Sequence, residues 1–551
     1  MKHISRVFIA FLTIITPLSM SAQTGVIKGR ISNKLNNETL PSATIQVVGT
    51  TQGAQSDANG DYQITDLEPR LYNIKVSFVG FKDIEVFEIQ VTNAKPTIQN
   101  FEMEENTEGL QEITVRASPF RKTEESPLSL RTIGVTEIAR NPGGNRDISR
   151  VIQSLPGVTA LPSFRNDLII RGGAPNENRF YLDDIEVPNI NHFATQGASG
   201  GPVGMLNVTF LKEVDFFSGA FPSNRGNSLS SVFNFRQRDG ASDKWRFTGT
   251  VGSSDFGLTA EGPLSKKTSF LFSARRSYLQ FLFKAIGLPF LPTYNDAQLK
   301  IKHKIDEKNE ITYMFLGAID QFTLDTTART TETKAYLLDQ LPIAPQWNYT
   351  NGITWKHFDK TGFWTFVASR NMLNNEAYKY KNDNDKNPKT FDYKSQEIEN
   401  KLRAERTTRL GNWKFLYGLS YEFAKYNNFT FQTRNVRDSV ILINYNSAFN
   451  MRKYGAFAQI SRKLSKDRLV LSLGARVDGN NYNAIMKNPF NQFSPRFSLS
   501  YALTPQLAFN FNTGIFNQLP PYPTMGFKQN NVFVNTNNLK YIKGYPPRSR
   551  T

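Results

Sequence analysis

The stretch that decides the fold is Leu168-Ile169-Ile170-Arg171-Gly172-Gly173-Ala174-Pro175-Asn176-Glu177-Asn178-Arg179-Phe180-Tyr181-Leu182-Asp183-Asp184-Ile185. It predicts a strand, a glycine-rich turn, a second strand and a tight acidic turn, because only glycine lets a backbone turn freely or approach a neighbour closely. Upstream, Asp147–Val158 predicts an amphipathic helix that ends at a Pro-Gly pair. Downstream come Leu211–Pro222, then Arg225-Gly226, then a strand at Val232–Phe235.

In order and spacing, these three blocks resemble the plug domain of TonB-dependent outer-membrane receptors. The match depends on all three, because a lone Arg-Gly-Gly is far more often an ordinary turn. The resemblance implies an α+β plug domain over residues 129–240 inside a transmembrane β-barrel. It also implies structural or gating roles for the residues that carry the motifs: Arg171, Gly172, Gly173, Asp183, Asp184, Gly219, Arg225 and Gly226.

Two arginines of this domain, Arg171 and Arg225, each lie beside glycine. In the family, plug arginines pair with carboxylates of the barrel wall, and a charge inside a lumen needs such a partner. The alternative is that both arginines lie at the surface. Asn189–Phe193 and Gln196–Gly204 predict a loop on the plug surface, which either touches a ligand or only joins strands.

Composition limits the class of protein. A chain of 551 residues predicts two or three domains. A hydrophobic content of 39% and a mean hydropathy of −0.43 exclude a helical membrane bundle. With 43 Phe and 21 Tyr, the chain still fits a transmembrane barrel, whose strands need only every second residue apolar. The absence of cysteine excludes disulfides, thiolate metal sites, a cysteine nucleophile and a lipidated N-terminal cysteine.

The net charge of +18 does not indicate a nucleic-acid partner. The charges are scattered, and neither zinc-finger spacing nor an aromatic RNA-binding motif accompanies them. A solvated lumen and loops beside an anionic membrane surface account for them.

Residues 1–22 predict a cleaved signal peptide, because basic residues precede a short apolar run and then small residues. Cleavage is expected next to Ala22. The mature protein therefore leaves the cytoplasm, and its membrane-spanning part must be a closed barrel. The expected location is the outer membrane.

Residues 23–103 predict a small β-sandwich. Alternating strands are expected at Gly25–Ile31, Ala43–Val47 and Tyr72–Phe78, with a turn at Asp57–Tyr62. The segment resembles the carboxypeptidase-regulatory-like domain that precedes the plug in many Bacteroidetes receptors.

The spacing of Asp57, Asn59 and Asp61 also resembles the start of a calcium loop. Tyr62 stands where that loop needs glycine, and strands rather than helices flank it. An ordinary hairpin turn is favoured, and no metal or cofactor is expected.

Residues 104–128 predict a polar linker with one short alternating strand, Leu110–Arg116. An unpaired strand in a linker suits addition to the sheet edge of another protein. In the family this position holds the TonB box, which a periplasmic energy transducer grips. The resemblance thus assigns energy coupling to Glu112, Ile113, Thr114 and Val115. The alternatives are a last strand of the sandwich or a plain spacer.

Residues 241–551 predict the N-terminal part of an antiparallel outer-membrane β-barrel. Roughly 13 strands of about ten residues each are expected, with short turns alternating with long loops. Examples of strands are Trp245–Val251, Ser269–Arg275, Gly362–Ala368 and Leu507–Asn512, and the expected long loops are Asp320–Asn348, Asn374–Gln396 and Tyr426–Asn450.

Plugged transporters have about 22 strands, and the last residues, Gly544–Thr551, lack a terminal aromatic residue. A truncated product is therefore expected, which would not insert alone because its open edge would leave backbone groups unsatisfied in lipid.

The fold class expected is mainly β: a small β-sandwich, an α+β plug and a partial antiparallel transmembrane barrel. No enzyme is expected, because no catalytic motif has a supporting context. The resemblance implies import of a scarce, unidentified small solute with a TonB-type partner. The alternatives are a non-transporting surface adhesin or assembly protein, and a truncated product without function.

Overall fold

The structure is a computed structural model that describes residues 24–106, 130–142, 144, 147–160, 165–198, 200–219, 221–436, 439–465, 468–504, 507–529, 532–534 and 539–544. The chain forms two compact units: Met1–Lys34 with Glu38–Ala117, and Leu35–Asn37 with Ser118–Thr551. Among the helices within these described ranges, none is both long and apolar enough to cross a membrane.

The first unit contains two four-stranded sheets, with strand orders β4-β1-β7 (β8 also pairs with β1) and β3-β2-β5-β6. One apolar core holds buried residues from both sheets, including Ile27, Ile45 and Ile74. This is the expected small β-sandwich. Its strands are β1 (Gly25–Asn33), β2 (Thr44–Val47), β3 (Gly53–Gln55), β4 (Asp61–Leu67), β5 (Leu71–Ser77), β6 (Ile84–Gln90), β7 (Thr97–Ile98) and β8 (Phe101–Met103).

The turn between β3 and β4 is closed by Asp57. Oδ1 of Asp57 accepts hydrogen bonds from the backbone N–H of Asn59 at 2.8 Å and of Asp61 at 2.9 Å. Gly60 has φ +75°, which glycine adopts without strain. The Asp57 carboxylate thus accepts hydrogen bonds from the backbone of its own turn, as expected for an ordinary hairpin turn.

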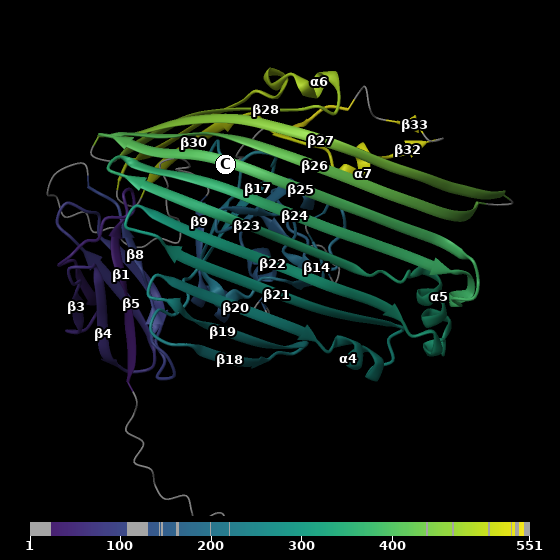
Figure 1. Ribbon diagram of the computed structural model, residues 1–551, viewed down its shortest axis with the longest axis horizontal. Coiled ribbons are helices and arrows are strands. Elements are labelled where there is room, and N and C mark those ends of the chain that lie inside the picture. Colours follow the sequence, from purple (N-terminus) through teal and green to yellow (C-terminus); the bar gives the residue numbers. More distant parts are fainter. Residues whose placement is uncertain are drawn as a thin grey trace, which may run out of the picture. The chain divides into compact units, whose positions relative to one another are not determined.

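The second unit begins with an inner domain, the described residues from 130 to 240. Its main sheet has the order β13-β12-β17-β16-β9, and its core includes Phe180, Val214 and Phe233. In Figure 1 these elements lie behind the large sheet. They are β9 (Leu130–Gly134), α2 (Val135–Arg140), α3 (Ile148–Gln153), β10 (Val158–Thr159), β11 (Ile169–Ile170), η1 (Pro175–Glu177), β12 (Asn178–Leu182), β13 (Ile185–Val187), β14 (Asn191–His192), β15 (Val203–Gly204), η2 (Val208–Phe210), β16 (Leu211–Phe217) and β17 (Ser231–Gln237).

The predicted amphipathic helix is α3, and it is shorter than expected. Asp147 caps it, because the carboxylate accepts a hydrogen bond from Ser149 N at 2.9 Å. Ile148, Val151 and Ile152 are buried against the inner-domain core.

The large sheet has 13 antiparallel strands in sequence order, from β18 to β30 (Figure 1). Their number agrees with the sequence prediction. The strands are β18 (Arg246–Val251), β19 (Asp255–Ser265), β20 (Thr268–Ser277), β21 (Phe290–Lys304), β22 (Asn309–Leu324), β23 (Gln346–Asp359), β24 (Gly362–Tyr380), β25 (Lys389–Leu410), β26 (Trp413–Val436), β27 (Ser439–Leu464), β28 (Leu469–Asn480), β29 (Ser494–Ala502) and β30 (Ala508–Gly514). Helices α4 (Leu279–Ala285) and α5 (Glu332–Gln340), and turns η3 (Thr326–Ala328) and η4 (Lys381–Asp383), connect some of them.

The expected long loops at Asn374–Gln396 and Tyr426–Asn450 are wrong. Strands β24 and β25 continue through most of the first, and β26 and β27 pair from Trp413↔Arg462 to Val436↔Ser439 across the second. The strands reach 26 residues rather than about ten. A ladder needs only backbone hydrogen bonds, so polar residues extend a strand where water rather than lipid surrounds it.

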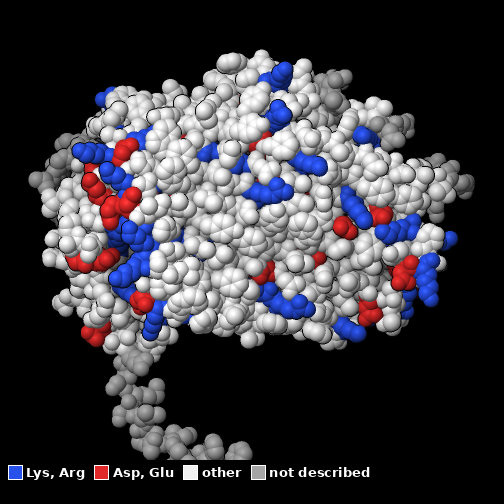
Figure 2. Space-filling model, viewed as in Figure 1, with Lys and Arg blue, Asp and Glu red and all other residues white. Residues whose placement is uncertain are grey.

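Burial alternates along the strands of the large sheet. On β26, Tyr417, Leu419 and Tyr421 are 43%, 65% and 44% exposed, whereas Leu416 and Ala424 are buried. Apolar and aromatic side chains therefore face outward on every second residue, as in a sheet that faces lipid. Figure 2 shows that charged side chains are sparse in the middle of this outer face and denser toward its edges.

After β30 the chain turns back and packs on the inner side of the sheet. Leu519, Tyr522 and Met525 form an apolar cluster with Tyr426 and Met451 of the strands. The elements after β30 are β31 (Phe516–Gln518), α7 (Tyr522–Met525), β32 (Lys528–Gln529), β33 (Val532–Phe533) and β34 (Ile542–Gly544), whereas α6 (Ala484–Lys487) and η5 (Pro489–Gln492) connect β28 to β29.

Candidate functional site

The acidic turn between β12 and β13 has an unusual backbone. Asp183 and Asp184 have φ of 47° and 72°, and a two-residue hairpin with two positive φ values usually carries Asn-Gly. Left-handed backbone at a residue other than glycine costs about 1–3 kcal/mol and persists only where its surroundings enforce it.

The surroundings that enforce this turn belong to the large sheet. Nζ of Lys300 lies 3.2 Å from Oδ2 of Asp183, and Nζ of Lys356 lies 3.1 Å from Oδ2 of Asp184. Arg403 donates to the carbonyl of Asp184 at 2.8 Å. Burial alone would raise the pKa of Asp184, but Lys356, Arg225 and Arg403 lower it below its usual range. The turn is therefore a charged contact between the inner domain and three strands, β21, β23 and β25.

Arg225 differs from the expectation. Nη2 of Arg225 lies 3.6 Å from Oδ1 of Asp184, a carboxylate of the inner domain itself, and its guanidinium lies 4.2 Å from the ring of Tyr181. Arg225 is only 5% exposed. Arg225 therefore pairs within the inner domain rather than with a carboxylate of the wall, and the sheet contributes cations to this contact.

The other motif residues lie at turns and at close contacts of the inner domain. Arg171 is exposed, with φ 51°, and Gly172 follows with φ +79°. Gly173 is closely packed, because a Cβ there would lie 1.6 Å from Oγ of Ser230. Gly219 has φ +103°. Gly226 lets the side chain of a sheet residue, Arg476, approach, because a Cβ would lie 2.4 Å from its Nε.

A second contact centres on His192, which is fully buried. Its Nδ1 lies 2.7 Å from Oδ1 of Asp320, and its Nε2 lies 3.0 Å from Oδ2 of Asp296. The ring stacks on Tyr294 with 4.2 Å between centroids. Burial alone would lower the pKa of His192, but Asp320 and Asp296 raise it to about 9. The imidazole is therefore cationic at neutral pH, and it joins β14 to β21 and β22.

The loop around His192 was expected either to touch a ligand or to join strands. In the structure it docks on the sheet. Ala194 N donates to Oε1 of Gln346 at 3.0 Å, and Nε2 of Gln346 donates back to the carbonyl of Ala194 at 2.7 Å. Nη2 of Arg275 donates to the carbonyl of Gly204 at 3.0 Å.

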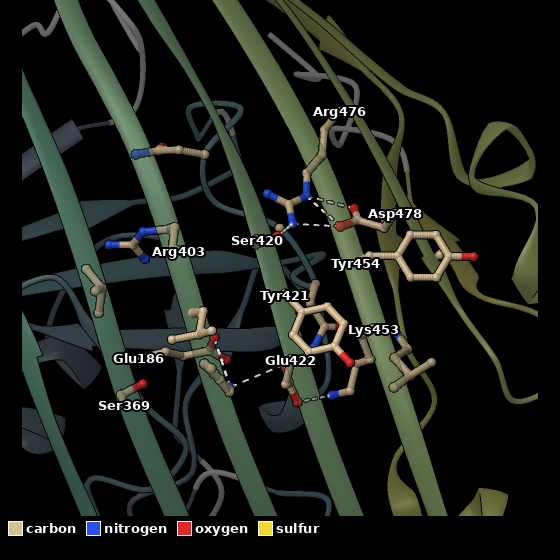
Figure 3. Close-up of a pocket in the computed structure, with 18 of the residues that line it drawn as sticks. Glu186, Ser369, Arg403, Ser420, Tyr421, Glu422, Lys453, Tyr454, Arg476 and Asp478 are labelled. Atoms are coloured by element: carbon tan, nitrogen blue, oxygen red, sulfur yellow. Dashed lines mark hydrogen bonds and ion pairs between the residues drawn. The ribbon is translucent and has the colours of Figure 1, made fainter.

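A third contact is a network around Lys401 of β25. Its Nζ lies 3.0 Å from Oε2 of Glu186 on the inner domain and 2.8 Å from Oε2 of Glu399. Tyr522 donates to Oε1 of Glu399 at 2.6 Å, and Lys453 pairs with Glu422. Figure 3 shows Glu186, Glu422 and Lys453 pointing into the same space.

That space is a cavity of about 110 Å³ between the inner domain and strands β24 to β28. Its lining carries charged side chains of both signs beside apolar ones such as Val367 and Leu402. Asp184 and Glu186 come from the inner domain, and Arg403, Glu422 and Arg476 come from the sheet (Figure 3). It suits a hydrated polar group better than an apolar one.

In the part of the chain that the structure describes, no group of three or more His, Cys, Asp or Glu is arranged to hold a metal ion. The energy-coupling residues Glu112, Ile113, Thr114 and Val115 lie outside the described residues.

The contacts of His192 and Lys401 were not predicted from the sequence. Their partners, Asp296, Asp320 and Glu186, are far away along the chain. The sequence feature that could have indicated these contacts is the presence of charged residues at inward-facing positions of the strands, because a buried charge needs a partner.

Three family models match the chain: a CarboxypepD_reg-like domain over residues 27–115, a TonB-dependent receptor plug domain over residues 122–231, and a TonB-dependent receptor-like β-barrel over residues 362–545. Among curated proteins, the TonB-dependent transporter Oar of Myxococcus xanthus is 24% identical over 292 residues, which are 46% of this chain and 26% of Oar. The chain thus matches about a quarter of the length of that relative.

Solved structures share the fold. A ferric enterobactin receptor mutant from Pseudomonas aeruginosa superimposes with a TM-score of 0.56 at 14% identity, over 75% of this chain and 65% of that one. The siderophore receptor PirA from Acinetobacter baumannii gives a TM-score of 0.53 at 13% identity, over 73% of this chain and 63% of that one. With a regulatory-like domain, a plug and a receptor barrel in that order, the chain belongs to the TonB-dependent receptors, a family of outer-membrane β-barrel proteins.

Proposed function

We propose that this protein takes up a scarce small solute across the outer membrane, and that a TonB-type periplasmic partner displaces the inner domain to open the path. The observation that supports this is the nature of the contact between the inner domain and the large sheet. Beside an apolar part, where Met314, Leu316, Ala318 and Val367 of the sheet join the inner-domain core, it includes ion pairs and hydrogen bonds at Asp183, Asp184, Glu186 and His192.

Such a contact can be broken and remade. Polar groups that separate exchange their protein partners for water, so the net cost of each hydrogen bond is about 0.5–1.5 kcal/mol. An apolar interface would instead lose about 25 cal/mol for every Å² exposed. The polar part of the contact therefore suits a domain that is moved by force and then returns.

The proposed point of force is the segment Glu112–Val115, which precedes the inner domain in the chain. A short alternating strand there would add to a sheet edge of the partner through backbone hydrogen bonds. The cavity of about 110 Å³ beside Glu186 is a section of the proposed path, which widens when the inner domain moves.

Strand addition is tested with the full-length protein and the periplasmic domain of the host's TonB-type protein. Ile113→Pro removes a backbone N–H and fixes φ, so we expect binding to fall at least tenfold. Ile113→Val keeps the strand and is the control. Equal binding by Ile113→Pro and the unchanged protein would contradict energy coupling at this segment.

Displacement is tested with an engineered disulfide, which the absence of native cysteine makes specific. Nδ2 of Asn207 on the inner domain lies 2.9 Å from Oγ of Ser273 on β20, so Asn207→Cys with Ser273→Cys would tether the two parts. Cells that depend on this receptor should lose growth on the limiting nutrient and recover it when a reductant is added. Growth that is unaffected by the tether on every nutrient tested would favour the adhesin or assembly alternative.

A further inference from the structure

One acidic side chain beside the Lys401 network takes no part in its ion pairs. The carboxylates are Glu186, Glu397, Glu399 and Glu422, and the cations are Arg179, Lys401 and Lys453. The ion pairs of the three cations go to three of the four acids, at Glu186, Glu399 and Glu422. The fourth acid, Glu397, takes part in none of these ion pairs.

Glu397 lies on the inward-facing side of β25, between Ser395 and Glu399. Its carboxylate has neither a hydrogen bond nor an ion pair to any residue that the structure describes. Glu399, two residues on, is bound by Lys401 at 2.8 Å and by Tyr522 at 2.6 Å. A partly buried carboxylate without a partner is costly, so Glu397 calls for a ligand or a proton.

A small cavity lies against Glu397. Its volume is about 40 Å³, and its lining includes Asn189 of the inner domain with Asn348 and Asn371 of the sheet. A buried water needs about 10–15 Å³ on this scale, so the cavity has room for an ion with a water or two.

The amide of Asn371 gives an independent sign of a missing ligand. Asn371 is 3% exposed, and its Nδ2 donates to Oε2 of Glu399 at 3.3 Å. Its Oδ1 is buried and has no partner among the residues described. Nδ2 of Asn348, also on the cavity wall, is likewise buried without a partner. Orphaned buried polar atoms are rare in native proteins and usually indicate an ion or water.

We infer that this cavity binds a hard metal cation, with Glu397 and Oδ1 of Asn371 as its protein ligands. A carboxylate and an amide oxygen are the ligand types that Ca²⁺, Mg²⁺ and similar ions take. The cation compensates the fourth carboxylate, and the N–H of Asn348 is left to donate to a water oxygen in the shell of the ion.

The site would join the inner domain to the sheet. Asn189 follows β13, whereas Asn348, Asn371 and Glu397 lie on the adjacent strands β23, β24 and β25. Loss of the ion would leave Glu397 and Oδ1 of Asn371 without a partner beside the Glu186 contact. The inference is separate from the proposed transport, because ion binding is measured without a solute or an energy-coupling partner.

The test uses Tb³⁺ as the probe and the full-length protein purified in detergent. Tyr349 lines the same cavity and would sensitise Tb³⁺ luminescence on excitation of the ring. We expect a Tb³⁺ signal that Ca²⁺ displaces, and Glu397→Gln should abolish this component because it removes the charge at nearly constant volume. Asn371→Ala should weaken Ca²⁺ competition roughly 10- to 100-fold. Glu332→Gln, at an exposed position on α5, is the matched control and should leave the signal unchanged.

A second measurement does not depend on any variant folding. Crystals of the unaltered protein soaked in Tb³⁺ should show an anomalous peak beside the Glu397 carboxylate. No peak there, or equal luminescence in Glu397→Gln and the unaltered protein, would overturn the inference and leave Glu397 as a protonated acid beside water.

Discussion

Nδ1 of His192 on the inner domain lies 2.7 Å from Oδ1 of Asp320 on β22, and neither side chain is exposed to solvent. The other oxygen of the same carboxylate accepts a hydrogen bond from the backbone N–H of Phe193 at 2.7 Å. One carboxylate of the sheet therefore holds both a side chain and the backbone of the inner-domain loop. Its removal or the loss of its partner should affect docking more than any exposed ion pair does.

His192→Gln should weaken the docking of the inner domain strongly. It removes the cation between Asp296 and Asp320, and breaking a buried pair in this way costs about 3–5 kcal/mol. The measurement is the free energy of unfolding in urea, with hydrogen exchange of the peptides that cover β14. His357→Gln is the control, because His357 is only part-buried and bonds a neutral amide, Asn309. Equal effects of the two changes would contradict a special role of His192.

The same contact should depend on pH. The pKa of His192 is raised from an ordinary value of about 6.5 to about 9. The docking energy from the charged imidazole is therefore fully present below about pH 6.5 and is lost as pH rises through 9. Hydrogen exchange at Asn191–Ala194, corrected for the intrinsic rate, should accelerate between these limits. His192→Gln should show no such midpoint, and a midpoint that persists in it would assign the transition to another group.

Asp183 and Lys300 should be energetically coupled. Their side chains are 12% and 7% exposed, so water screens the pair less than it screens a surface pair. A double-mutant cycle with Asp183→Asn and Lys300→Met should give a coupling of about 1–3 kcal/mol in urea unfolding. The exposed pair Lys304–Glu307 should give about 0–1 kcal/mol. A coupling at Asp183 no larger than at Glu307 would show that the acidic turn is held by its backbone alone.

Gly173→Ala should destabilise the inner domain by about 1–3 kcal/mol, because overpacking forces neighbours to move. The new Cβ would meet Ser230 and Glu177. Gly249→Ala on β18 is the matched control, since no atom lies within 4 Å of its Cβ position and its φ is ordinary. Thermal unfolding of the two variants in the same detergent makes the comparison. An unfolding midpoint lowered equally in both variants would indicate that replacing any glycine destabilises the protein, and that a packing clash at residue 173 is not the cause.

Much of the fold was predictable from the sequence. The strand–turn–strand at Ile169–Val187, the number of strands in the large sheet and the sandwich near Ile45 follow from local patterns of apolar residues and turn residues. The lengths of β26 and β27 were not predictable in this way, because Asn427–Asn435 is mostly polar and Val440–Ile443 is a run of apolar residues without alternation. In these segments the strands are recognisable only from the backbone hydrogen bonds between them, which the sequence does not show.

The candidate site was predictable only in part. Asp183 and Asp184 were expected to have a structural or gating role, and they do contact the sheet. The sequence did not show that their partners on the sheet would be cations. His192 was placed in a loop, and its role depends on the register that brings Asp296 and Asp320 together on neighbouring strands. Register between β21 and β22 is a property of the assembled sheet rather than of either strand.

The hairpin of β26 and β27 has a consequence for the outer surface of the cell. Strands of 24 and 26 residues extend about 80 Å at roughly 3.3 Å per residue. A tilted strand crosses the hydrocarbon layer in about ten residues. More than half of this hairpin therefore extends beyond the lipid as a hydrogen-bonded, two-stranded ribbon. Antibodies and phage tail fibres would meet this ribbon first among the strands that the structure describes, so variation between strains should concentrate in its outer half.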